Sequence, residues 1–599
     1  MSKGEKNGNA GSKILMSIAE TKELMDVALG RAGADLVIED ADVVNVYTGE
    51  VQSNLSICVK GERIACTTPD PSDVVGPNTT VIDGAGRTVI PGLIDGHTHI
   101  AWLFTAAEFI PYALKGGATT VVSESMESYP VGGVGGVIDF LDSLKDQPMK
   151  FFATAPAMVS ISRAAAGIAE ADLARLLSRD DIIGLGESYW QSILQNPEGI
   201  LPEFHQTLGA GKNLEGHSAG ARGKKLMAYA AAGVSSCHEP ITADEVLERL
   251  RLGMHVMIRE GSIRADLKPI SQIKDAGIDF RRLILATDGV EPVDLIEKGY
   301  MASVLQKAID YGFPPVTAVQ MATLNVAEHF GLDRHIGGIG PGRYADMLIL
   351  PNLTTIDPEY VISNGKIAVK NGELQVASRV HDFSGESRHS IHIDGEMSAA
   401  DFAIRMDGDA PEAAVRVMEM VTDLVTKESH LTVPVRSGEI HADPETDLLK
   451  AAAVDRRIRP GKTFAGLIRG FGLRKGAMAA SAAWDCSDII VVGASGEEMA
   501  AAVNRIRELQ GGIVVCVDGK VAAELPLPIL GLLSDRSIPE LADAISTIKV
   551  AVAELGVSFP DPLLTLVTLT GAAIPYFRIC EEGLVNLKDG ETVGVVVEG

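Results

Sequence analysis

Residues 91–100 read PGLIDGHTHI, and this stretch decides the fold that we expect for the chain. Its apolar run ends in two histidines two residues apart, whose side chains would face the same side of a strand. Seven further apolar runs follow, each next to a helix-like segment: TTVVSES (119–125), KFFATAPAM (150–158), IIGLGES (182–188), NLEGHS (213–218), GVSSCHE (233–239), HVMIREG (255–261) and LILATDG (283–289). Eight βα units predict a closed parallel (β/α)8 barrel of the TIM type over residues 91–340, with a doubly wound open sheet as the alternative.

The segments on either side of these units have a different pattern. Residues 34–90 and 341–395 contain short β-branched runs separated by Asn, Gly and Ser, which is typical of antiparallel strands. We therefore expect both flanks to pack as one small β-sandwich into which the barrel is inserted. Residues 396–599 again alternate strand-like and helix-like runs, which predicts a C-terminal α+β domain. Residues 1–33 are expected to form a tail and one short helix.

Composition excludes several classes of protein. The chain has 599 residues and a formal charge of −27, which disfavours binding to nucleic acid. The hydrophobic content of 46% is enough for large cores. Six scattered cysteines suit a cytoplasmic protein without a disulfide scaffold. We see no apolar run of membrane-spanning length and no secretion signal.

Residues of the types that commonly bind metals, His, Glu and Asp, stand at the ends of five of the predicted strands. In chain order they are the His97/His99 pair, Glu187, His217, His238 and Asp288. Each of these motifs taken alone is more often structural than functional. The ends of parallel barrel strands meet at one mouth, however, so four imidazoles and two carboxylates are expected to converge there. Such a set can hold two divalent cations, which lower the pKa of a bound water molecule, while Asp288 accepts a proton.

These motifs, in this order, resemble the amidohydrolase superfamily and, within it, the adenine deaminases. The similarity extends through GGIGPGRYADMLIL in the returning flank to LPLPILGLLSD and GLVNLKDG near the C-terminus, and covers roughly residues 34–599. It implies two metal ions (Mn, Fe or Zn), with His97 and His99 on the first, His217 and His238 on the second, and Glu187 bridging them. It also implies that Asp288 is a metal ligand that carries a proton.

The resemblance suggests further site residues. Glu239 matches a His-Glu pair of the family and is a possible second acid or base. Arg259 stands at another strand end, where either a substrate contact or a structural salt bridge is expected.

The chain departs from the family at three outer motifs, which we expect to contribute to substrate binding. It has Ile100-Ala101-Trp102 where the family continues with x-Glu-Ser, and Glu124-Ser125-Met126-Glu127 where the family has Asp-Pro-His-Glu. It has Trp484-Asp485-Cys486-Ser487-Asp488 where the family has His-Asp-Ser-His-Asn. Met or Trp in place of His exchanges a polar contact for apolar bulk, which would alter recognition of a heterocycle. Trp102 and Trp484 either stack on a planar substrate or simply pack.

Three functions remain open at this point. The first is hydrolysis of a C–N bond in a small nitrogen heterocycle, with deamination of adenine or a modified aminopurine to give ammonia as the leading case. The second is hydrolysis of a cyclic amide, lactam or imide by the same metals. The third is a non-catalytic homologue that binds a ligand. The family resemblance also implies a homo-oligomer, either a dimer or a tetramer.

Overall fold

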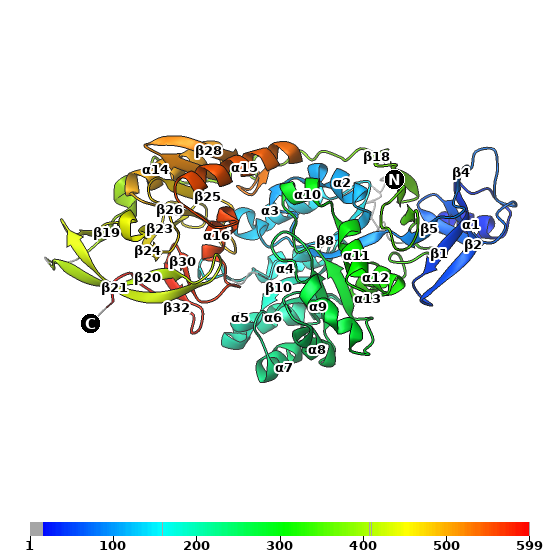
Figure 1. Ribbon diagram of the computed structural model, residues 1–599, viewed down its shortest axis with the longest axis horizontal. Helices are drawn as coiled ribbons and strands as arrows, with labels where there is room; N and C mark the ends of the chain where they lie inside the picture. The colour runs from blue at the N-terminus through cyan, green and yellow to red at the C-terminus, as the bar shows by residue number, and fades with distance from the viewer. Residues whose placement is uncertain (1–15, 158–159, 407, 409, 598–599) are drawn as a thin grey trace, which may run out of the picture.

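The eight predicted strands lie together in the middle of the molecule (Figure 1). The structure is a computed structural model that describes residues 16–157, 160–406, 408 and 410–597. Five parallel strands form one arc, in the order β11-β10-β9-β8-β6, and three form a second, β12-β13-β14. Their bounds are β6 (Leu93–Thr98), β8 (Ala118–Ser123), β9 (Lys150–Ala155), β10 (Ile182–Tyr189), β11 (Asn213–His217), β12 (Ser236–Cys237), β13 (His255–Arg259) and β14 (Leu283–Ala286).

Backbone hydrogen bonds connect the two arcs on both sides. Ser235 donates to the carbonyl of Leu214 at 2.9 Å, beside β11 and β12, and Asp288 donates to the carbonyl of His97 at 2.9 Å, beside β14 and β6. The sheet therefore closes, which confirms the predicted barrel. Its outer helices are α2 (Ala106–Lys115), α3 (Ser128–Ser143), α4 (Glu170–Leu177), α5 (Trp190–Gln195), α6 (Pro197–Gly209), α7 (Gly223–Ala231), α8 (Ala243–Arg251), α9 (Leu267–Ile270), α10 (Pro292–Glu297), α11 (Met301–Asp310), α12 (Pro315–Met321) and α13 (Leu324–His329).

The segments that flank the barrel in the sequence meet in one nine-stranded sheet at one end of the molecule (Figure 1). Strand β5 of the first flank pairs antiparallel with β15 of the second, with Val89 opposite Ile349. The bounds are β1 (Leu36–Asn45), β2 (Glu50–Lys60), β3 (Arg63–Thr68), β4 (Thr80–Asp83), β5 (Thr88–Pro91), β15 (Met347–Leu350), β16 (Tyr360–Ser363), β17 (Lys366–Lys370) and β18 (Glu373–Leu374). The helix predicted within residues 1–33 is α1 (Ile18–Ala28), and residues 1–15 of the predicted N-terminal tail lie outside the described residues.

The C-terminal part is built on a ten-stranded sheet at the opposite end, and its α+β character is as predicted. Its strands are β19 (Ile404–Arg405), β20 (Glu412–Met420), β21 (Thr426–Arg436), β22 (Glu439–Ile440), β23 (Leu448–Asp455), β24 (Thr463–Arg469), β25 (Ala477–Ala480), β26 (Asp488–Gly493), β27 (Gly512–Val517) and β28 (Lys520–Pro526). Helices α14 (Gly496–Leu509), α15 (Ile538–Glu554) and α16 (Pro562–Val567) and a small sheet of β30 (Phe577–Cys580), β31 (Gly583–Asn586) and β32 (Glu591–Val593) complete it.

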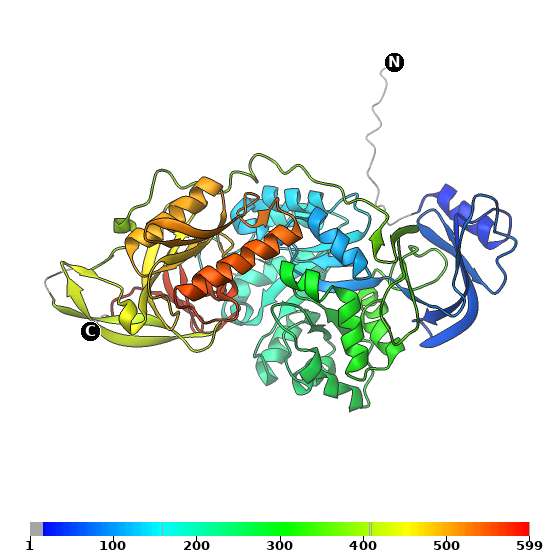
Figure 2. The ribbon, with the colours of Figure 1, turned by 45° about the horizontal axis from the view of Figure 1, so that its top comes forward.

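This C-terminal part contacts the barrel directly. Strand β29 (Leu533–Ser534) pairs with β7 (Leu103–Phe104), which begins four residues after His99. Figure 2 shows α15 running along the boundary between the C-terminal sheet and the barrel. There the Lys549 ammonium lies 3.3 Å from the carboxylate of Glu291, at the start of α10. Across the described ranges, no helix has the length and apolar character that a bilayer crossing requires.

Candidate metal centre

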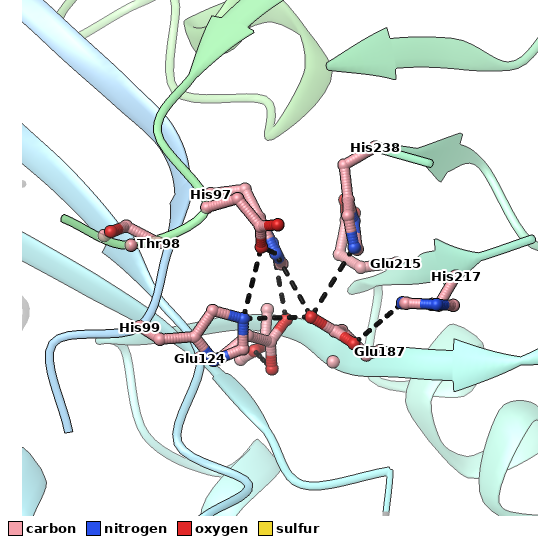
Figure 3. A network of polar contacts seen from close by, with 12 residues as sticks. His97, Thr98, His99, Glu124, Glu187, Glu215, His217 and His238 are labelled. Atoms are coloured by element: carbon pink, nitrogen blue, oxygen red, sulfur yellow. Dashed lines mark hydrogen bonds and ion pairs between the residues drawn. The ribbon is translucent and has the colours of Figure 1, made fainter. Parts of the chain in front are cut away.

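The six predicted ligands come together at the C-terminal ends of five barrel strands. Figure 3 shows five of them, the four histidines and Glu187, with their side chains directed toward one another. His97 is in β6 and His99 follows it directly, with ring centroids 5.3 Å apart. Glu187 is near the end of β10 and His217 is the last residue of β11. His238 and Asp288 follow β12 and β14. A parallel barrel directs all these strand ends to one mouth, which is why residues distant in sequence meet.

The carboxylate of Glu187 is the centre of the cluster, because it contacts all four imidazoles. Its Oε1 lies 3.3 Å from His97 Nε2, 3.0 Å from His99 Nε2 and 3.6 Å from His238 Nε2. Its Oε2 lies 3.0 Å from His217 Nδ1. One oxygen therefore faces three imidazoles and the other faces the fourth.

Asp288 supplies a second carboxylate to the same group. Its Oδ1 lies 3.2 Å from His97 Nε2 and 3.4 Å from His99 Nε2. The residue has a φ of +57°, a region that Asp tolerates better than most residues, and its N–H is bonded to the carbonyl of His97. The backbone thus fixes Asp288 against the strand that carries the two histidines.

The carboxylates of the cluster strongly stabilise positive charge on the neighbouring imidazoles. Burial disfavours a charged imidazole, but hydrogen bonds with Asp288 and Glu187 outweigh it and raise the pKa of His97 to about 10. Against the same burial penalty, the charge of Glu239 and a hydrogen bond with Glu187 raise the pKa of His217 to about 9. Burial also opposes ionisation of Glu187, yet the surrounding imidazoles hold its pKa well below the usual range. Buried anions of this kind require cations beside them.

The donor atoms fit divalent metals. Three sets have ligand atoms within 4.8 Å of one another: His97, His99, Glu187 and Asp288; Glu187, His217 and His238; and His238, Glu239 and Asp288. His97 Nε2 is buried, 3.3 Å from Glu187 Oε1 and 3.2 Å from Asp288 Oδ1. Imidazole nitrogen with carboxylate oxygen is a donor set that Zn, Fe and Mn accept.

Glu239 and Arg259 form an ion-pair network beside the cluster. Glu239 Oε1 lies 3.3 Å from His238 Nε2 and contacts Arg259 Nη1, which also lies 3.2 Å from Asp288 Oδ2. Burial raises the pKa of Glu239, but the charges of Arg259 and His217 outweigh it and lower that pKa to about 2. Asp266, which was not predicted, accepts hydrogen bonds from Arg259 Nε at 3.2 Å and from Arg259 Nη2 at 3.0 Å. Nothing in its local sequence distinguishes this Asp from a turn residue.

The remaining predicted residues divide into two groups. Glu127 contacts His99 Nδ1, and Glu124 Oε1 lies 3.7 Å from His97 Nδ1, so both face the site histidines. Four others make no hydrogen bond or ion pair with the six central residues within the described structure: Trp102, Met126, Trp484 and Asp485. They form contacts between the barrel and the C-terminal part.

These contacts are of two kinds. The rings of Trp102 and Trp484 meet edge to face at 6.5 Å, which supports aromatic packing between them. Met126 lies in an apolar cluster with Tyr189 and Ala572. Asp485 accepts a hydrogen bond from the hydroxyl of Tyr189 at 3.1 Å. Tyr189 was not predicted, although it comes two residues after Glu187 at the end of the same strand.

The fold and this cluster define a hydrolase of the amidohydrolase type, and residues 88–371 match the amidohydrolase family model. Residues 423–591 match the adenine deaminase C-terminal domain. The chain is 36% identical over 585 residues to adenine deaminase of Moorella thermoacetica, with 96% of this chain and 98% of that protein covered. It is 35% identical over 582 residues to adenine deaminase of Cenarchaeum symbiosum, with coverages of 96% and 94%. The chain therefore belongs to the adenine deaminase family within this metal-dependent superfamily.

Proposed function

We propose that this enzyme deaminates adenine or a closely related aminopurine, releasing ammonia, with two divalent metal ions (Mn, Fe or Zn) at the barrel mouth. The observation that carries the proposal is the contact of one carboxylate, Glu187, with imidazoles from three strand ends. Full-length similarity to adenine deaminases supports the choice of substrate.

In this proposal His97 and His99 hold one ion, His217 and His238 hold the other, and Glu187 binds both. When bound, the ions supply Lewis acidity that activates water and polarises the substrate. Two imidazoles and two carboxylates meet within contact distance on the first side, which suits a tightly held cation. The neutral imidazoles and the ionised Glu187 are the forms that bind metal.

Asp288 is the proton carrier in this proposal. Hydrogen bonds with His97 and His99 and the charge of Arg259 overcome burial and keep its pKa well below the usual range, so it is ionised and can accept a proton at Oδ1. Arg259 Nη1 engages the other oxygen, Oδ2, and this leaves Oδ1 facing the cluster. Glu239 is held ionised by the same arginine, which it contacts directly, and is the second candidate acid or base of the site.

Ammonia release tests the proposal. Enzyme reconstituted separately with Mn, Fe and Zn is assayed on adenine, other aminopurines, aminopyrimidines and lactams, with chromatography of the products. Ammonia and hypoxanthine from adenine, lost in His217→Ala, would support deamination. Ring-opened product from a lactam with no ammonia from any aminopurine would favour cyclic-amide hydrolysis instead. Well under one metal per chain together with no turnover would favour a ligand-binding homologue.

We further propose that the protein is cytoplasmic and forms a homo-oligomer, as the sequence suggests. All six cysteines are free in the structure, which suits a reducing compartment. Light scattering of the purified chain would give the number of subunits.

A further inference from the structure

The segment between β8 and α3 lies against the histidines of β6. The Glu124 N–H donates to the carbonyl of Thr98 at 2.9 Å, which ties the start of this segment to the strand that carries His97 and His99. Glu127 is the residue immediately before α3. Its side chain is 13% exposed, and the ring that it contacts, His99, is 16% exposed. The pair is therefore largely shielded from solvent.

Glu127 binds the side of the His99 ring that faces away from the other ligands. Its Oε1 contacts His99 Nδ1, whereas His99 Nε2 lies 3.0 Å from Glu187 Oε1 and 3.4 Å from Asp288 Oδ1. A carboxylate at Nδ1 holds the proton there and leaves the lone pair on Nε2, the nitrogen that faces the metal-binding atoms. It also fixes the plane of the ring.

We propose that Glu127 is a positioning residue that sets the tautomer and orientation of His99 for metal binding, and is not a substrate-binding residue. The inference rests on the metal-dependent function proposed above. It assigns a different role from the one expected from the sequence.

Glu124 does not have the same geometry. Its Oε1 is 3.7 Å from His97 Nδ1, beyond hydrogen-bond range, and its Oε2 accepts from the Thr154 hydroxyl at 2.7 Å. Of the two acids in this segment, Glu127 alone is close enough to hold a histidine proton. Its other oxygen, Oε2, is buried without a hydrogen-bond partner among the described residues.

Metal titration tests the proposal without depending on any substrate. The full-length chain is stripped of metal and titrated with Mn²⁺ alone and Zn²⁺ alone against a competing chelator, for the parent, Glu127→Gln and Glu127→Ala. Loss of a carboxylate behind a ligating histidine weakens metal binding by about 10–100-fold, and we expect this for Glu127→Ala. We expect a smaller loss for Glu127→Gln, because its amide oxygen can still accept a hydrogen bond from the Nδ1–H group of His99.

The control is a carboxylate–histidine pair outside the barrel mouth. Asp139 Oδ1 lies 2.7 Å from His381 Nε2, so Asp139→Asn makes the same kind of change without touching the cluster and should leave metal affinity unchanged. Metal affinity within twofold of the parent in both Glu127 variants would overturn the proposal, and a raised KM in those variants would then identify Glu127 as a substrate contact. Glu127→Gln keeps the shape of the side chain, so it remains informative if Glu127→Ala does not fold. Since the titration measures metal alone, failure of the deaminase assay would not affect it.

Discussion

At the scale of single residues, the cluster depends on Glu187 more than on any one imidazole. Each histidine contacts two or three carboxylates, and Glu187 contacts all four histidines. A neutral amide at this position would leave the buried imidazoles without their shared anion. Loss of this one charge should therefore affect both metal positions together.

We predict that Glu187→Gln loses metal at both sites and that its kcat falls by more than the roughly 10–100-fold typical of residues behind the ligands. Elemental analysis and steady-state assays of the purified variant would check this. Glu198→Gln, an exposed position on α6, provides the matched amide substitution and should behave as the parent. Retention of two metals per chain by Glu187→Gln would contradict a bridging role.

The sequence predicts well which central side chains meet, because strand order carries the information. Each of His97, His217 and Asp288 follows an apolar run, and a barrel brings such positions to one mouth. Asp266 and Tyr189 could not be found in this way. Their contacts with Arg259 and Asp485 depend on loop conformation and on packing between domains, which residue periodicity does not encode. The same limit applies to the contact of Glu127 with His99, which strand order does not predict.

At the scale of elements, glycine lets the barrel strands approach closely beside the site. Gly216 is the residue before His217 on β11. A Cβ added there would lie 2.3 Å from the carbonyl oxygen of Ser236 and 2.6 Å from the hydroxyl of Tyr229. The first of these atoms belongs to the backbone of β12, the first strand of the second arc. A side chain would therefore push the two arcs of the barrel apart.

We predict that Gly216→Ala destabilises the fold by about 1–3 kcal/mol, the usual cost of overpacking, and displaces His217. Thermal unfolding and metal titration of the variant would show both effects. Gly209→Ala is the control, because a Cβ at this helical position in α6 meets no atom within 4 Å. It should raise stability slightly, by about 0.4–1 kcal/mol, through the unfolded state. Equal stability of the two variants would show that β11 can shift without cost.

At the scale of the whole molecule, the C-terminal part meets the candidate metal centre at the buried pair Tyr189–Asp485. Asp485 accepts from the Tyr189 hydroxyl at 3.1 Å through Oδ1 and from the Ala572 N–H at 2.8 Å through Oδ2. The ring of Tyr189 in turn meets that of His217 edge to face, with centroids 4.8 Å apart. A residue 268 positions after His217 thus determines how a barrel side chain packs on it. The C-terminal part is therefore connected to the site by this chain of contacts.

We therefore predict that Asp485 and Tyr189 act as a unit. Asp485→Ala and Tyr189→Phe should each lower kcat/KM, and the double variant should be no worse than the poorer single variant, because removing either partner already breaks the hydrogen bond. Lys549→Gln is the control, since it breaks a different contact between the same two parts, the pair with Glu291, and should leave kcat/KM unchanged. If the free-energy effects of the two substitutions simply added, the pair would not be coupled. An equal loss in Lys549→Gln would instead mean that general docking of the C-terminal part, and not this hydrogen bond, supports His217.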